Sequence, residues 1–188
     1  TANVLAQELG LPLGPAAAAR VAAGLRTIAA PLAEAGGRHF LLMVGAGFDA
    51  HVVKNVRYAA KRRWGKFAYV AEMIRQLSRC PFRRYRAIVD GVAPDAASIV
   101  VTRGRFYGGR FLLAPDARLT APTLQVCLFG MGGRRGALLY AAALGLGLLP
   151  KAPGFRILQG RRVRIEGPAD GIADGEPVQG DGDGIAPV

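Results

Sequence analysis

A series of short apolar segments, separated by glycine and proline, occupies most of this 188-residue chain after residue 40. The segments are rich in valine, isoleucine and aromatic residues, which is typical of β-strands, and the connections between them have the composition of turns. The strand candidates are residues 40–44, 85–89, 97–103, 110–113, 124–129, 155–158, 161–165 and 172–178. This pattern predicts an antiparallel sheet, with a hairpin turn at Asp90-Gly91.

Helices are expected at residues 3–9, 15–30, 48–63 and 66–79, where strong helix formers or apolar residues at helical spacing occur. The character of the chain changes at Gly36-Gly37, so we predict a domain boundary near residue 36. A further apolar run, at residues 137–149, is too short for a membrane span, which needs about 20 residues. It is either a buried helix or an interfacial helix that contacts lipid, and the basic residues that flank it keep the second alternative open.

The net charge of +12 is unevenly distributed along the chain. Residues 57–86 contain ten Lys and Arg and one acid, whereas residues 166–183 contain six of the thirteen acids. Such a basic segment attracts the phosphates of nucleic acid or of an anionic membrane, although a solvated arginine-rich surface is an equally open interpretation. The two cysteines and the absence of any Cys/His cluster predict a reduced, cytoplasmic protein without a metal site, and the first residues do not form a signal peptide.

Three glycine-containing blocks stand out: Gly45-Ala-Gly-Phe-Asp-Ala50, Phe106-Tyr-Gly-Gly-Arg-Phe-Leu-Leu-Ala-Pro-Asp-Ala117 and Asp174-Gly-Glu176. Glycines after a strand allow a tight turn or the close approach of a ligand, and Asp49 either caps the next helix or contacts that ligand. The Tyr107-Gly108-Gly109 sequence fits a hairpin turn or the wall of a pocket. A carboxylate such as Glu176 can accept the proton of an attacking alcohol, but Asp-Gly-Glu is also a common surface turn.

In this order and spacing, the three blocks resemble the C-terminal half of the diacylglycerol-kinase family of lipid kinases, which includes sphingosine- and ceramide-kinase relatives. The resemblance implies a mainly β fold with some α (α+β). Residues 1–35 would be a short helical remnant of an α/β nucleotide-binding domain, and residues 36–188 an antiparallel β-sandwich that binds the lipid. The family's Gly-Gly-Asp-Gly-Thr phosphate-binding motif is absent and would lie upstream, so we expect the fragment to be inactive alone.

The resemblance also implies roles for individual residues. Thr1 and Asn3 match the family's Thr-Ala-Asn segment, which helps to hold ATP. Glu176 matches the base that activates the lipid hydroxyl, and Asp174 the acid beside it. The residues that would frame the acceptor cleft are Gly47, Phe48, Asp49, Tyr107, Gly108 and Gly109.

The implied cofactors are ATP and the Mg²⁺ that accompanies it. Many bacterial members of the family bind a structural magnesium through acids that follow Pro-Asp-Ala, but residues 118–124 contain no acid, so we expect no such site near Asp116. The implied partners are a lipid substrate and an anionic membrane surface, which would place the protein in the cytoplasm, peripherally at the inner membrane face.

Other functions remain open at this stage. The chain could be a catalytically silent membrane-binding scaffold, a basic nucleic-acid-binding module, or part of a soluble-substrate kinase such as an NAD kinase. The second of these is disfavoured because residues 57–86 contain no recognised nucleic-acid motif. Diacylglycerol and a sphingoid base are the alternative acceptors, and a homodimer through an exposed sheet edge is a further alternative for the partners.

Overall fold

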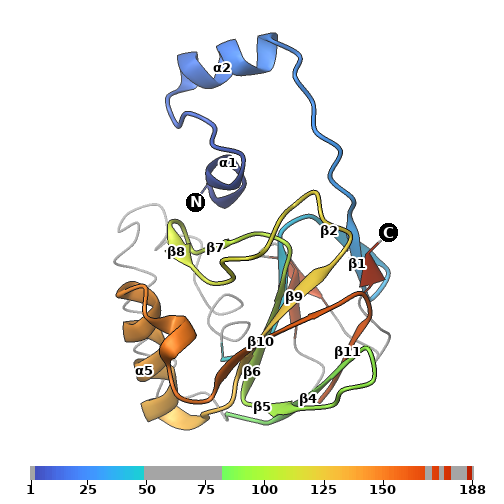
Figure 1. The fold of residues 1–188 in the computed structure, drawn as a ribbon, viewed down its shortest axis with the longest axis vertical. Helices are drawn as coiled ribbons and strands as arrows, with labels where there is room; N and C mark the ends of the chain where they lie inside the picture. The colour runs from blue at the N-terminus through green and yellow to red at the C-terminus, as the bar shows by residue number, and fades with distance from the viewer. Residues whose placement is uncertain (1–2, 49–81, 168–170, 174–175, 179–185, 188) are drawn as a thin grey trace.

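The computed structural model describes residues 3–48, 82–167, 171–173, 176–178 and 186–187 (Figure 1). The helices in this part of the chain are α1 (Val4–Glu8), α2 (Pro15–Ala23), α5 (Gly133–Gly145) and the 3₁₀ helix η1 (Leu149–Lys151). The predicted helices at 48–63 and 66–79 lie almost entirely outside the described residues, as does most of the basic segment.

A six-stranded antiparallel sheet forms the centre of the molecule, in the order β10-β9-β6-β3-β12-β13. Its strands are β3 (Met43–Gly47), β6 (Ser98–Thr102), β9 (Leu124–Phe129), β10 (Phe155–Gly160), β12 (Gly171–Ala173) and β13 (Glu176–Val178). Val101 of β6 lies opposite Val44 of β3 on one side and Val126 of β9 on the other. The strands β6 and β9 therefore have neighbours on both edges and are almost fully buried.

One face of the six-stranded sheet packs against two smaller sheets, β14-β1-β2 and β11-β4-β5 (Figure 1). Their strands are β1 (Ala33–Ala35), β2 (Arg38–Phe40), β4 (Tyr85–Val89), β5 (Asp95–Ala96), β11 (Val163–Glu166) and β14 (Ala186–Pro187). Ile99 and Val101 of β6 enter the core between these layers, whereas Val100 enters a second core on the opposite face, as the alternation of side chains along a strand requires. The predicted antiparallel β-sandwich is confirmed.

The opposite face of the six-stranded sheet is covered by α5 and by a two-stranded ribbon, β7 (Phe106–Tyr107) and β8 (Phe111–Leu112). Within α5 only Gly136 and Tyr140 are buried, and Leu138 on its outer side is half exposed. One side of the helix therefore packs on the sheet and the other side faces solvent. The helix starts and ends about four residues earlier than the predicted run at 137–149. No helix in the described ranges is long and apolar enough to cross a membrane.

The strand predictions agree with the structure to within a few residues, but the helix predicted at 15–30 is wrong in its second half. It ends at Ala23, because Gly24 caps it and Leu25 has a positive φ of 49°. No residue of α1 or α2 is buried as a whole, although the Glu8 side chain of α1 is, and α2 projects away from the sheets (Figure 1). The domain boundary near residue 36 stays a prediction.

The predicted turn at Asp90-Gly91 is present, with positive φ at both residues (44° and 96°), as a type I′ hairpin turn requires. The Asp90 carboxylate accepts hydrogen bonds from the backbone N–H groups of Arg161 and Arg162, each at 3.0 Å. These bonds favour the ionised form and lower the pKa of Asp90. The turn is thereby tied to the connection between β10 and β11.

We predict that Asp90→Asn lowers the free energy of unfolding at neutral pH, since an amide oxygen cannot replace both charge-assisted bonds. Asparagine tolerates positive φ, so the turn itself should persist. Because the pKa of Asp90 is lowered in the folded state, its carboxylate stabilises the fold fully above the ordinary aspartate pKa of about 4. This stabilisation is lost as the pH falls through the folded-state pKa. Denaturant unfolding should show a difference in the free energy of unfolding between wild type and variant that disappears on acidification. A difference that does not change with pH would contradict this prediction.

Candidate functional site: an apolar pocket under α5

A pocket of ≈ 310 Å³ lies between the six-stranded sheet, α5 and the β7–β8 ribbon. Its wall is formed almost entirely by apolar, aromatic and glycine residues, including Val100, Leu113, Phe129, Ala137, Ala141 and Leu144. The Ser98 hydroxyl in this wall already donates a hydrogen bond to Ala46 O at 2.9 Å. A cavity of this size and lining suits an apolar ligand such as an acyl chain.

Tyr140 fixes α5 over the sheet and so defines one wall of the pocket. Its hydroxyl accepts a hydrogen bond from Met131 N and donates one to Pro153 O, both at 3.0 Å. Its ring packs edge-on against Phe129, with 5.1 Å between centroids. Met131 lies just before α5 and Pro153 follows it, so these two hydrogen bonds hold the helix in place. Because both use the Tyr140 hydroxyl, it adds no free polar group to the pocket.

Gly47 and Phe48 form the predicted junction at the end of β3. Gly47 has a φ of 102°, and a Cβ there would lie 2.8 Å from Ala97 O and 2.9 Å from Ser98 Cα. The position therefore requires glycine for two independent reasons. Phe48 follows, lines the pocket and stacks on Phe82 with 5.5 Å between ring centroids.

The Tyr107-Gly108-Gly109 sequence is both a hairpin turn and part of the pocket. Gly108 and Gly109 have φ values of 55° and 125° in the connection between β7 and β8, and Tyr107 and Gly108 line the cavity. The two interpretations left open by the sequence are thus compatible. The structure brings Phe48, Tyr107 and Gly108 to one pocket, with Gly47 and Gly109 beside them in the chain.

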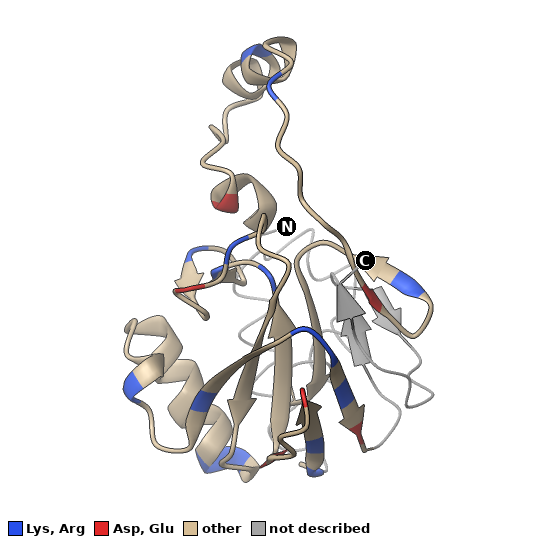
Figure 2. Cartoon of the chain, turned by 45° about the vertical axis from the view of Figure 1, so that its right-hand side comes forward, with Lys and Arg blue, Asp and Glu red and all other residues tan. Residues whose placement is uncertain are grey.

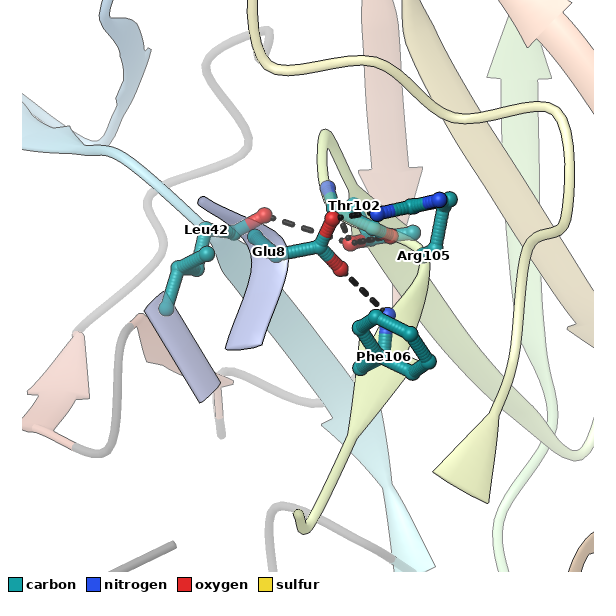
Figure 3. A network of polar contacts seen from close by, with 6 residues as sticks. Glu8, Leu42, Thr102, Arg105 and Phe106 are labelled. Atoms are coloured by element: carbon teal, nitrogen blue, oxygen red, sulfur yellow. Dashed lines mark hydrogen bonds and ion pairs between the residues drawn. The ribbon is translucent and has the colours of Figure 1, made fainter. Parts of the chain in front are cut away.

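A buried carboxylate that the sequence analysis missed connects α1 to this ribbon (Figure 3). The Glu8 side chain is 2% exposed; it accepts a hydrogen bond from Phe106 N at 2.6 Å and lies 3.3 Å from Arg105 Nε. The hydroxyl of the neighbouring Thr102 accepts from Gly104 N and lies within hydrogen-bond distance of Gly104 O and Leu42 O. A carboxylate near the C-terminal end of a helix interacts unfavourably with the helix dipole. This unfavourable position was the signal in the sequence that could have drawn attention to Glu8.

Arg103 holds the loop that follows Asp116. Its guanidinium is fully buried and donates to Leu119 O at 2.6 Å and Ala121 O at 2.8 Å, while Nε and Nη1 find no partner within the described residues. Asp116 itself is exposed in a turn closed by Ala117 N and Ala114 O. The described ranges contain no cluster of three His, Cys, Asp or Glu side chains that could hold a metal. The expectation of no structural magnesium near Asp116 stays a prediction, and the Arg103 guanidinium fixes this loop through two backbone carbonyls.

The other predicted site residues are only partly described. Asn3 is the exposed residue before α1, with a φ of 50°, and its carbonyl accepts a bond from Gln7 N. Glu176 begins β13, where its backbone pairs with Ala173 of β12. Thr1, Asp49 and Asp174 lie outside the described residues, so their roles, like those of Asn3 and Glu176, stay predictions.

Comparison with known proteins places this geometry in a family. The model of the YegS C-terminal NAD kinase beta sandwich-like domain matches residues 42–188. This chain belongs to that family. It is 32% identical over 136 residues to the probable lipid kinase YegS-like of Pseudomonas aeruginosa, an alignment that covers 68% of this chain and 43% of that protein.

Solved structures agree with this assignment at the level of the fold. The whole chain superimposes on 63% of a candidate diacylglycerol kinase from Bacillus anthracis with a TM-score of 0.77, and on 63% of a diacylglycerol kinase from the same organism with a TM-score of 0.71, each at 20% identity. The chain thus spans less than two thirds of the length of these relatives. The predicted resemblance to the C-terminal domain of diacylglycerol-kinase-like lipid kinases is confirmed.

We predict that Glu8→Ala frees α1 from the β7–β8 ribbon, because it leaves the Phe106 N–H unsatisfied and removes the ion pair with Arg105. Hydrogen exchange of the Phe106 amide and of α1 should accelerate at least about tenfold. Glu8→Gln keeps one acceptor and should have a smaller effect. Amides of β9 serve as an internal control; equal acceleration there would indicate global destabilisation and contradict a local tie.

Proposed function

We propose that this chain is the acceptor-binding C-terminal part of an ATP-dependent lipid kinase. The observation that supports this most directly is the pocket under α5, whose apolar wall and occupied hydroxyls suit the hydrocarbon part of a lipid. In the proposed reaction the lipid hydroxyl attacks the γ-phosphorus of ATP, the bond to the β–γ bridging oxygen breaks, and ADP leaves. Glu176 takes the hydroxyl proton, a role consistent with the resemblance of Asp174-Gly-Glu176 to the family motif.

The acceptor is a lipid with a free hydroxyl group, such as diacylglycerol or a sphingoid base. Mg²⁺ accompanies the ATP and neutralises charge on its phosphates. Thr1 and Asn3, which match the family segment that helps to hold ATP, contribute to the binding of the nucleotide. The protein acts as a peripheral enzyme at the inner face of the membrane, where its substrate is embedded.

The base assignment is tested by Glu176→Gln in the intact protein, which should reduce phosphate transfer from ATP to a lipid extract by at least about a hundredfold. Glu166→Gln provides a matched control, because Glu166 is an exposed acid on β11 whose side chain pairs with Arg164 at 3.6 Å, away from β13. Chromatography of the labelled product identifies the acceptor. Full activity of Glu176→Gln would remove this residue from the role of base, and an inactive wild type would refute the kinase.

The pocket assignment is tested by Ala141→Phe, which fills the cavity from α5. Ala142→Phe is the matched control, since Ala142 is exposed and does not line the pocket. With a short-chain diacylglycerol that is soluble as a monomer, we expect Ala141→Phe to raise the KM for the lipid at least about tenfold, because it removes the apolar contacts of the chain. The KM for ATP should not change; unaltered lipid kinetics in both variants would place the acyl chain elsewhere.

A further inference from the structure

The pocket opens onto a surface that is both apolar and basic. Phe111 and Met131 line the pocket and are also exposed at its mouth. Leu138 and Leu146, on α5 and just beyond its C-terminal end, add large exposed side chains at 52% and 73% of their full area. Around the helix axis Leu138 lies about 60° from the pocket-lining Ala141, so the outer side of α5 is continuous with the mouth.

Positive charges surround this apolar surface. Arg110 lies in the connection between β7 and β8, Arg135 on the first turn of α5, and Lys151 in η1, and all three are exposed. The chain contains no Asp or Glu at all between residues 117 and 165, whereas it has eight Lys and Arg there. Figure 2 shows basic segments and no acidic one on α5. We call the surface formed by α5, η1 and the β7–β8 ribbon the α5 face.

We infer that the α5 face docks on an anionic lipid bilayer, with the exposed leucines entering the interfacial layer and the basic residues contacting the headgroup phosphates. This inference deepens the proposed function and rests on it in one respect, since it takes the bilayer as the source of the lipid that enters the pocket. Lipid leaving the membrane would then reach the pocket without crossing water.

The chemistry of the surface selects this partner over others. A second copy of the chain would set like charges against each other, because α5, η1 and the β7–β8 ribbon contain basic residues and no Asp or Glu within the described residues. Nucleic acid would satisfy the basic residues but would leave the exposed leucines in water. An anionic leaflet offers a charged layer above an apolar one, which is the arrangement that an interfacial helix with a basic rim matches.

The apolar part is tested by vesicle co-sedimentation of the intact protein and its Leu138→Ser/Leu146→Ser variant. On phosphatidylcholine vesicles that contain phosphatidylglycerol, we expect the double variant to bind at least about tenfold more weakly. The leucine side chains gain free energy when they leave water for the interfacial layer, and serine side chains do not. Val92→Ser is the matched control: Val92 is 61% exposed but lies between β4 and β5, in a different sheet, and its change should alter binding less than about twofold.

The basic part is tested by Arg110→Gln/Arg135→Gln/Lys151→Gln. Each basic residue near an anionic surface strengthens binding by roughly fivefold, so the triple variant should lose at least about tenfold in affinity and most of the preference for phosphatidylglycerol. Replacing Arg161, Arg162 and Arg164 by Gln makes the same change in charge at the far end of β10, about 20 Å along the strand from Phe155. Equal losses in the two triple variants would show attraction by net charge alone and overturn the inference.

Assays with soluble substrate and with vesicles separate catalysis from membrane docking. Phosphorylation of a soluble short-chain diacylglycerol should be unchanged in the α5-face variants, since none of the replaced residues lines the pocket. Vesicle binding that follows the expected pattern in an inactive protein would refute the kinase and retain the docking surface. Wild-type vesicle affinity in both sets of variants would overturn the docking surface. If these variants also lost the mass of a dimer in sedimentation velocity, the α5 face would be assigned to contact with a second copy of the chain.

Discussion

The structure depends on the burial of β6 and β9 from both sides. Both strands lie inside the six-stranded sheet, and their side chains alternate between two cores, so each face of the sheet must be covered. On one face the cover is a second layer of strands, which closes the sandwich. On the other face the cover described by the structure consists of α5, η1 and the β7–β8 ribbon. The pocket is the part of this second face that protein atoms leave open.

Most strands could be predicted from the sequence because their apolar runs are local and end at glycine or proline. Gly47 and the Asp90 turn could also be predicted, since positive φ at these positions leaves few alternatives. The contacts of Glu8, Arg103 and Tyr140 could not, because their partners lie between 9 and 98 residues away. For Glu8 an acid near the C-terminal end of a helix was the available signal, and nothing in the sequence identified Phe106 as its partner.

Arg103 shows how the chain organises the loop that follows Asp116, where residues 118–124 contain no acid. A buried guanidinium carries a desolvation penalty, and burial lowers its pKa, yet the group stays charged because its ordinary value is so high. Two backbone carbonyls offset part of this penalty. Arg103 therefore fixes the backbone of this loop through Leu119 O and Ala121 O, which are 16 and 18 residues away in the sequence.

The register of the sheet relates the proposed chemistry to the proposed ligand. Ala173 pairs with Val44, close to Leu42, and Glu176 pairs with Ala173, so β13 starts at the end of the sheet where Thr102 and the Glu8 network lie. That is also the end contacted by α1, which follows the segment proposed to bind ATP. The α5 face lies on the side of the pocket away from the sheet. If a lipid enters from a bilayer held there, its hydrocarbon would lie under α5 and its hydroxyl would point toward α1, which Glu8 holds against the β7–β8 ribbon.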